Sequence, residues 1–149
     1  MSNQFDDDYA TCKKCYVSLL IYPNDYSILD ITQGMNIQPK QSFQKGDIRI
    51  TSRGIKKTHQ NSLWLLSSED FVNSLDIRRH LGWLLNELKP SKNYLLHLQK
   101  DEKIQMYVKG IWWSKFGDGG PMIWPEHMAL LAEMNLELGF EISFFGEDK

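Results

Sequence analysis

One pattern occurs twice along this chain, once in each half. Each copy begins with an apolar run typical of a strand, CYVSLLIY at Cys15–Tyr22 and IQMYVKGIWW at Ile104–Trp113. An apolar helical segment follows each run and ends in a Met-Asn-apolar turn, at Ile31–Ile37 and at Met128–Leu136. Internal similarity of this kind predicts two related strand–helix units. Because 149 residues suffice for one domain and not for two ordinary ones, both units are expected to share one core.

The segments between and after the two units supply further elements. Apolar periodicity predicts strands at Leu63–Leu66 and Phe140–Phe144. It also predicts the longest helix at Leu75–Leu88 and a shorter helix at Ser91–Lys100. We therefore predict an α+β fold: a single domain whose mixed, largely antiparallel sheet comes from two strand–helix–strand pseudo-repeats, with helices packed on one face. The polar residues 1–11 are expected to form a flexible N-terminal segment, and residues 12–149 the domain.

Local signals predict where the helices begin and end. Ser74 is the expected N-cap of the longest helix, and Gly34 is expected to end the first helix. Pro125 suits the first turn of the last helix, because proline has no amide that the helix would need there. The inward side of that helix is predicted to carry Met128, Leu131 and Ala132.

Composition and charge restrict the setting in which the chain works. The formal charge of −2 is too small to drive binding to a polyanion by itself. The N-terminus is acidic where a signal peptide would be basic and then apolar, and no apolar run approaches the roughly 20 residues that cross a bilayer. A cytoplasmic protein with no membrane contact is therefore expected, and two cysteines are consistent with a reducing compartment.

Several short motifs occur in a characteristic order. They are Val17–Tyr22, Ile31–Pro39 (ITQGMNIQP), Ser42–Asp47 (SFQKGD), Ser62–Ser68 (SLWLLSS), His80–Pro90 (HLGWLLNELKP) and the tail Pro125–Phe145. Together they resemble a bacterial family known as domain of unknown function 4279, over residues 16–145. The resemblance implies a fold and a bacterial origin, and it brings no catalytic residues, because none are established for the family. One departure is Trp124, which precedes a helix where Ser or Thr would be expected as a cap.

The positions of cysteine and histidine argue against a metal or redox centre. Cys12 and Cys15 have the spacing of a redox or zinc half-site, but they precede a strand, where no helix dipole lowers a thiol pKa. The four histidines are scattered and no second cysteine pair exists, so a zinc site lacks ligands. Incidental thiols are the favoured interpretation, and no cofactor or metal is expected.

Two loop segments have features of ligand sites, and both have a simpler interpretation. Gly117–Gly120 lacks the Gly-Lys-Ser/Thr ending of a phosphate loop, which favours a flexible turn. Lys45–Lys57 holds five basic side chains, but the chain as a whole is nearly neutral, which favours a solvated loop over phosphate contacts. The signature of single-stranded RNA binders is also missing, so a nucleic-acid partner is not expected.

Aromatic residues of the two principal strands are predicted to gather on one face of the sheet. If Val17, Leu19 and Ile21 pack beneath the helices, alternation places a second set on the opposite face. That set is Tyr16, Leu20, Tyr22, Tyr107, Ile111 and Trp113. An exposed apolar patch of this kind typically marks a binding surface. The alternative, given equal weight, is that Phe43–Lys57 or the helix pair folds over this face and buries it.

Two classes of function follow. The first, favoured here, is a non-enzymatic protein-binding module, for example an immunity protein that neutralises a bacterial toxin through the aromatic face or the acidic run Asp6–Asp8. The second is a small-ligand-binding or enzymatic domain with a pocket near Lys115–Trp124, walled by Trp112, Trp113 and Trp124. No nucleophile elbow, phosphate loop or metalloprotease motif is present. We expect a protein partner and a monomer or homodimer, with the binding residues Tyr16, Tyr22, Tyr107, Trp113 and Trp124.

Overall fold

A mixed sheet forms one layer of the molecule. The structure is a computed structural model that describes residues 4–146, and within these residues the sheet has five strands in the order β2-β5-β1-β6-β7. The strands are β1 (Cys12–Tyr22), β2 (Gln41–Phe43), β5 (Leu63–Ser67), β6 (Gln105–Ser114) and β7 (Leu138–Phe144). All neighbouring pairs are antiparallel except β6 and β7, which are parallel. The predicted α+β class with a largely antiparallel sheet is confirmed.

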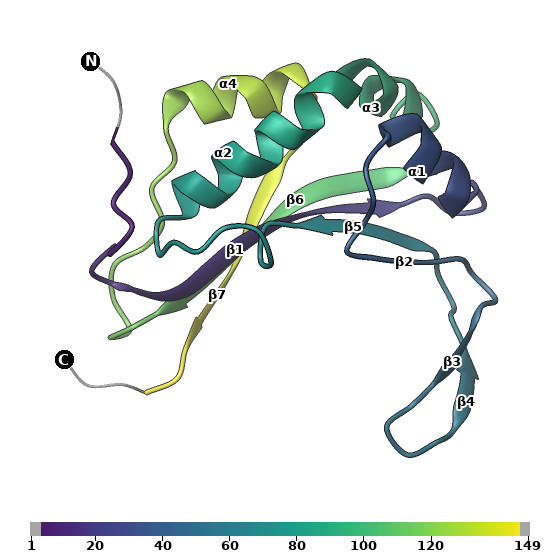
Figure 1. The fold of residues 1–149 in the computed structure, drawn as a ribbon, viewed down its shortest axis with the longest axis horizontal. Helices are drawn as coiled ribbons and strands as arrows, with labels where there is room; N and C mark the ends of the chain where they lie inside the picture. The colour runs from purple at the N-terminus through teal and green to yellow at the C-terminus, as the bar shows by residue number, and fades with distance from the viewer. Residues whose placement is uncertain (1–3, 147–149) are drawn as a thin grey trace.

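The helices form the second layer. The described residues contain α1 (Ile28–Met35), α2 (Ile77–Leu88), α3 (Lys92–Leu98) and α4 (Pro125–Glu133), and a short 3-10 turn at Lys89–Ser91 joins α2 to α3. Figure 1 shows all four on the same side of the sheet. A separate hairpin of β3 (Ile48–Ile50) and β4 (Lys56–Thr58) projects beyond the β2 end of the sheet and away from the helices (Figure 1). No helix of the described part covers the opposite face of the sheet.

The two halves of the chain share their first two elements and then differ. β1 leads to α1, and β6 leads to α4, as the repeated pattern predicts. After α4 the chain returns to β7, which pairs parallel to β6 through a crossover. After α1 it passes through β2 and the hairpin before β5 pairs antiparallel to β1. The repeated strands β1 and β6 pair with each other at the centre.

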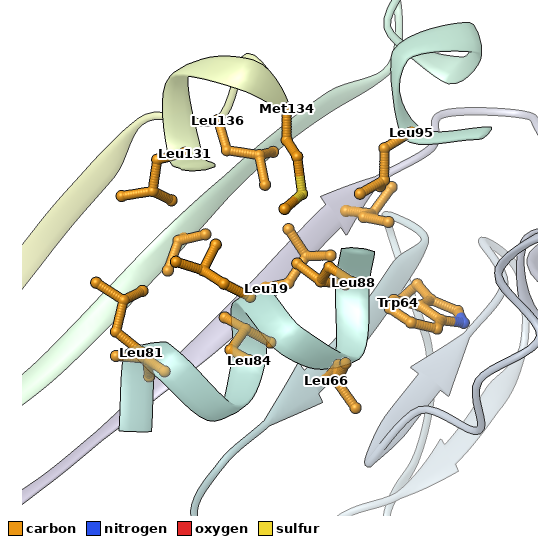
Figure 2. Packing of buried hydrophobic residues seen from close by; sticks show 14 of the residues in the cluster. Leu19, Trp64, Leu66, Leu81, Leu84, Leu88, Leu95, Leu131, Met134 and Leu136 are labelled. Atoms are coloured by element: carbon orange, nitrogen blue, oxygen red, sulfur yellow. The ribbon is translucent and has the colours of Figure 1, made fainter. Parts of the chain in front are cut away.

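The core lies between the two layers. Val17, Leu19 and Ile21 of β1 are fully buried beneath the helices, as their alternation predicts. Leu81, Leu84 and Leu88 recur along one side of α2, and Figure 2 shows them packed against the sheet together with side chains from α3, α4 and the turn before β7. Complete burial of one leucine side chain contributes about 1.5–3 kcal/mol, so this stripe holds α2 on the sheet.

The helix ends differ in part from the sequence prediction. α2 is capped by Asp76, whose carboxylate accepts from the Arg78 amide, and not by Ser74. α1 ends at Asn36, which adopts the left-handed conformation, two residues beyond the predicted Gly34. Asparagine replaces glycine there because its short polar side chain tolerates a positive φ.

The last helix begins as predicted but presents a different side to the core. Pro125 occupies its first turn, and Trp124 precedes it without a capping side chain. His127 and Leu131 are buried, whereas Met128 is more than half exposed. α4 therefore turns a histidine inward where an apolar side chain was expected.

Candidate functional site

The side of the sheet without helices brings four of the five predicted binding residues together. We call it the open face; its central residues are Lys14, Tyr16, Ser18, Leu20 and Tyr22 of β1 and Gln105, Tyr107, Lys109, Ile111 and Trp113 of β6. The register pairs Tyr16 with Ile111, Leu20 with Tyr107 and Lys14 with Trp113. Paired residues of neighbouring strands point to the same side, so Tyr16, Tyr22, Tyr107 and Trp113 share this surface.

Contacts between these side chains hold the open face in shape. The rings of Tyr22 and Tyr107 stack with their centroids 6.2 Å apart, and Trp113 meets Phe145 edge-on at 4.7 Å. The Lys14 ammonium lies 5.6 Å from the Tyr16 ring and 5.2 Å from the Trp113 ring, within reach of a cation–π attraction. These contacts leave all four aromatic side chains half-buried.

Two lysines of the open face form ion pairs. Lys14 binds Glu69 at 3.0 Å, and Lys109 binds Glu141 at 3.6 Å. Hydrogen bonds from Lys40 and then from Lys14 lower the pKa of Glu69, which keeps this carboxylate charged. The pair Ser18 and Lys109 lies in the middle of the register, so polar and aromatic side chains alternate along the open face.

A depression lies where the open face meets the hairpin. Its volume is about 290 Å³, and Tyr22, Phe43, Arg49 and His59 contribute to its wall. Phe43 stacks on His59 with ring centroids 3.7 Å apart, which fixes the wall between β2 and the base of the hairpin. Burial raises the pKa of Tyr22 above its usual value, so its hydroxyl stays protonated at neutral pH.

Trp124 lies elsewhere. Its ring is 5.1 Å from that of Phe5, 5.5 Å from that of His127 and 4.8 Å from the Arg78 guanidinium. These neighbours belong to the N-terminal segment and the helical layer. The alternation of side chains assigns a residue to one face of the sheet only within a strand. Trp124 follows a loop, so its position could not be predicted from the sequence.

The three tryptophans proposed as walls of one pocket do not meet. Trp112 is fully buried in the core beside Tyr9, whereas Trp113 faces the opposite side of the sheet. Adjacent residues of a strand point to opposite faces, which separates these two side chains. The segment 115–124 therefore lacks the wall expected for it.

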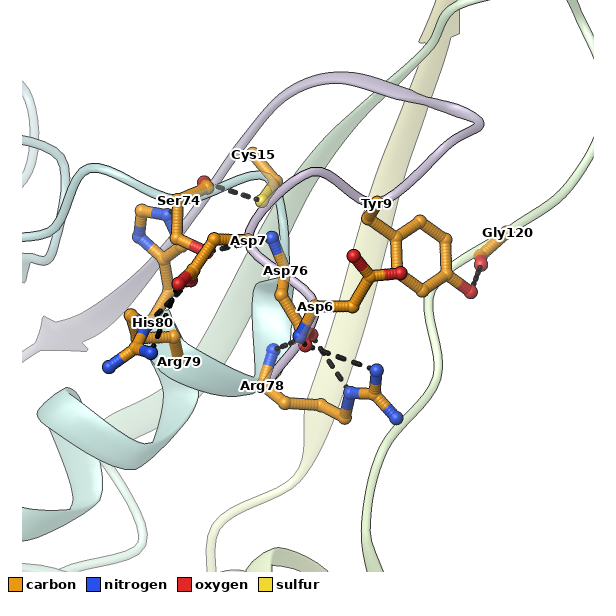
Figure 3. Close-up of polar contacts among 10 residues, drawn as sticks. All are labelled: Asp6, Asp7, Tyr9, Cys15, Ser74, Asp76, Arg78, Arg79, His80 and Gly120. Carbon is orange, nitrogen blue, oxygen red and sulfur yellow. Dashed lines mark hydrogen bonds and ion pairs between the residues drawn. The ribbon is translucent and has the colours of Figure 1, made fainter. Parts of the chain in front are cut away.

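A buried polar network surrounds the start of α2 (Figure 3). The His80 ring contacts the Ser68 hydroxyl through Nδ1 at 2.7 Å and the Ser74 carbonyl through Nε2 at 2.8 Å. A carbonyl only accepts, so Nε2 carries the proton and Nδ1 accepts from Ser68. Ser68 in turn accepts from the Val17 amide at 3.0 Å. Burial lowers the pKa of His80, and all of its hydrogen bonds are satisfied.

This serine–histidine pair was missed by the sequence analysis and is structural. Ser68 and His80 have exposed fractions of 0% and 1%, so no substrate reaches them. The available signal was the position of His80 on the buried side of α2, one turn from Ile77 and Leu84. A polar residue in that stripe must find partners inside the protein.

The N-terminal segment is tied to the same region. The Asp6 amide donates to Asp76 at 2.7 Å, Asp7 forms an ion pair with Arg79 at 2.7 Å, and the Tyr9 hydroxyl donates to the Gly120 carbonyl at 2.7 Å. Figure 3 shows these residues gathered at the start of α2. Residues 1–3 of the predicted flexible segment lie outside the described residues, and the flexibility of residues 4–11 stays a prediction.

Both cysteines face the core. Cys12 and Cys15 are buried, and a bulge in β1 between Cys12 and Lys14 turns both toward the helices. The Cys15 thiol donates to the Ser74 carbonyl at 3.6 Å, and the neighbouring Cys12 sulfur and burial raise its pKa. Among residues 4–146, no three metal-binding side chains cluster. The described helices also include none with the length and apolar character needed to cross a membrane.

Comparison with known proteins decides the family. A model of the domain of unknown function DUF4279 matches residues 13–145, nearly the whole chain. The chain belongs to this family. No curated protein matches it, and no solved structure does. The DUF4279 match thus confirms the resemblance seen in the motifs and leaves function to be argued from the surface.

Proposed function

We propose that this DUF4279 domain is a protein-binding module whose binding surface is the open face. The observation that supports the proposal most directly is the cluster of Tyr16, Tyr22, Tyr107 and Trp113 on the helix-free side of the sheet. Tyrosine and tryptophan are the side chains that most often anchor protein interfaces. The stacking of Tyr22 on Tyr107 and the packing of Trp113 against Phe145 limit the motion of these side chains, so little conformational entropy is lost on binding.

Charge supports a partner with a partly acidic surface. The hairpin beside the open face carries Arg49, Arg53, Lys56 and Lys57, all exposed, and only Asp47 opposes them in this segment. Since the whole chain has a charge of −2, the remainder is acidic and the hairpin is a local positive region. Such a region guides an oppositely charged partner and raises its association rate.

A bacterial toxin is the partner class that we favour, in a cytoplasmic complex. The domain would act by covering the toxin's active site with the open face and would not itself be an enzyme. The acidic run Asp6–Asp8 is less suited to this role, because Asp7 is already paired with Arg79 and Ser74. The open face, by contrast, lies on the side of the sheet that no helix of the described residues covers (Figure 1).

Co-purification with matched variants tests this proposal. The tagged protein is recovered from its native host as wild type, as Tyr107→Ala/Trp113→Ala and as Phe71→Ala. Phe71 is also an exposed aromatic residue, but it stacks on Trp83 of α2 and so lies in the helical layer. The proposal predicts a stoichiometric protein with wild type and Phe71→Ala and its loss from the double variant.

The identity of the recovered protein then tests the toxin assignment. Its expression alone should stop growth, and co-expression of the wild-type domain, but not of the double variant, should restore it. Recovery of the same protein by the folded double variant would refute the open face as the binding surface. Recovery of a bound small molecule in place of a protein would support the alternative, a ligand-binding or enzymatic domain.

A further inference from the structure

The outer edge of β7 has unpaired backbone groups. The Val108 amide donates to the Glu137 carbonyl at 2.9 Å. This bond shows which residues of β7 direct their backbone groups toward β6. Gly139, Glu141 and Ser143 therefore direct their amides and carbonyls toward β6, and Phe140, Ile142 and Phe144 direct theirs outward. Within residues 4–146, these outward groups make no hydrogen bond. β7 is thus a ready template for another strand.

The side chains of these outward residues are apolar and exposed. Phe140, Ile142 and Phe144 have exposed fractions of 39%, 57% and 49%. Soluble proteins usually protect a sheet edge with charges, proline, a bulge or a very short strand. β7 has seven residues in unbroken register with β6, and its one charged residue, Glu141, points to the open face, where it pairs with Lys109.

The opposite edge of the sheet is protected in the usual way. β2 has only three residues, and Gln41 and Ser42 follow Pro39 and Lys40. The same molecule therefore protects one edge and leaves the other apolar and unpaired. This asymmetry indicates that β7 has a partner strand.

We propose that the partner is the β7 strand of a second copy of this chain, paired antiparallel across a two-fold axis at Ile142. Antiparallel pairing about such an axis closes the assembly as a dimer and leaves no further β7 edge exposed. The two sheets become one continuous sheet, with the outward amides and carbonyls of Phe140, Ile142 and Phe144 bonded to those of the other copy.

The register follows from the side chains. With the axis at Ile142, Phe140 of one copy faces Phe144 of the other, the two Ile142 side chains meet, and Glu141 faces Ser143. With the axis at Glu141, two carboxylates would face each other directly, and like charges in that position are destabilising. With the axis at Ser143, Phe140 would face Gly146 and one apolar pairing would be lost.

The area available is sufficient for a reversible dimer. Three large side chains in each copy, about half exposed, bring roughly 600 Å² to the contact, and the paired backbone adds to it. Specific interfaces begin near about 1,000 Å², so we expect association in the micromolar range rather than an obligate dimer. The open face stays uncovered, and the inference does not depend on the function proposed for it.

Sedimentation velocity over a range of protein concentrations tests the dimer. Wild type is expected to shift from monomer to dimer as the concentration rises through the micromolar range. Ile142→Lys should stay monomeric, because two ammonium groups would meet at the axis. Ile48→Lys is the matched control: it also places lysine at an exposed strand isoleucine, but on the hairpin, and it should dimerise like wild type. Circular dichroism checks that both variants fold.

A cross-link tests the register. Facing residues that exchange two hydrogen bonds have Cα atoms about 5.5 Å apart, within the range of a disulfide. Ile142→Cys should therefore give a covalent dimer on mild oxidation. Ser143→Cys should not, because Ser143 of one copy faces Glu141 of the other, and the two Ser143 positions are two residues out of register. A wild type that stays monomeric, an Ile142→Lys variant that dimerises like wild type, or equal cross-linking at both positions would overturn the proposal.

Discussion

Trp112 and Trp113 are neighbours in the chain with opposite surroundings. Trp112 is 1% exposed and contacts Tyr9 in the core, whereas Trp113 lies on the open face beside Lys14. The same type of side chain therefore packs in the core at one position and forms part of the open face at the next.

Replacing each of these tryptophans in turn measures the difference. Trp112→Ala should lower the free energy of unfolding by about 3–5 kcal/mol, because it leaves a large cavity in the core. Trp113→Ala should lower it less, by about 1 kcal/mol, because the side chain lies at the surface of the sheet and leaves no closed cavity. Urea denaturation of both variants supplies the comparison. Equal losses would mean that the open face is part of a core.

His80 makes stability depend on pH. Burial lowers its pKa, so below the ordinary histidine pKa of about 6.5 the unfolded chain binds a proton that the folded chain does not. Acidification in that range therefore favours unfolding, and stability is fully present above it. Wild type should lose stability between about pH 7.5 and 5.5, as measured by urea midpoints, and His80→Gln should lose less. An identical loss in both would exclude His80 as the cause; His127, whose pKa burial also lowers, would remain.

At the scale of elements, alternation and helical periodicity predicted much of the structure. The two faces of β1 and β6 followed from alternation because the side toward the helices is apolar over most of its length. The buried stripe of α2 followed from the spacing of Leu81, Leu84 and Leu88. Pairing of strands did not follow, because it depends on contacts between distant segments; β7 was predicted as a strand, but not its parallel pairing or its exposed edge.

The start of α2 shows why caps were harder to predict than helices. Ser74 and Asp76 are both good N-cap residues, and their roles are settled by contacts from elsewhere in the chain. Asp76 caps because the Asp6 amide and the Arg78 side chain also satisfy its carboxylate, and Ser74 instead donates to Asp7. Burial by itself would raise the pKa of Asp76, but the hydrogen bonds from the Arg78 side chain and from the Asp6 and Arg78 amides together outweigh it and lower this pKa.

The contribution of the Asp76 cap to the free energy of unfolding can be compared with that of the Ser27 cap of α1. Asp76→Ala removes a carboxylate that is 1% exposed and leaves Arg78 without its partner, so unfolding should become easier by about 3 kcal/mol. Ser27 caps α1 through a single exposed bond of 3.4 Å to the Asp30 amide, and Ser27→Ala should cost about 0.5–1 kcal/mol. Thermal or urea denaturation of both gives the ranking. A reversed order would mean that the network in Figure 3 adds little.

At the scale of the whole molecule, the domain has one covered and one uncovered side. Helices occupy one side of the sheet, the open face lies on the other, and the basic hairpin projects beside it (Figure 1). Composition alone suggested neither feature, because the basic residues are diluted by the acidic remainder of a nearly neutral chain. The uncovered aromatic side of the sheet and the positive hairpin beside it are therefore properties of the fold.

The hairpin should influence how fast a partner binds more than how stable the domain is. Arg49 and Lys57 face each other across β3 and β4 and are exposed. Arg49→Ala/Lys57→Ala should slow association several-fold at low salt and reduce its salt dependence, with little change in the dissociation rate. Lys92→Ala, on α3, is the control and should bind as wild type does. Surface plasmon resonance at two salt concentrations distinguishes these cases, and unchanged association would refute a guiding role.

The five tryptophans provide the most direct test of the open face. Each gives one indole N–H signal in a ¹⁵N-correlated NMR spectrum, and single Trp→Phe variants assign them. During titration with the recovered partner, the Trp113 signal should shift, whereas those of Trp83 and Trp124 in the helical layer should stay in place. A partner that shifts Trp83 or Trp124 and leaves Trp113 unchanged would contradict the claim that the open face is the binding surface.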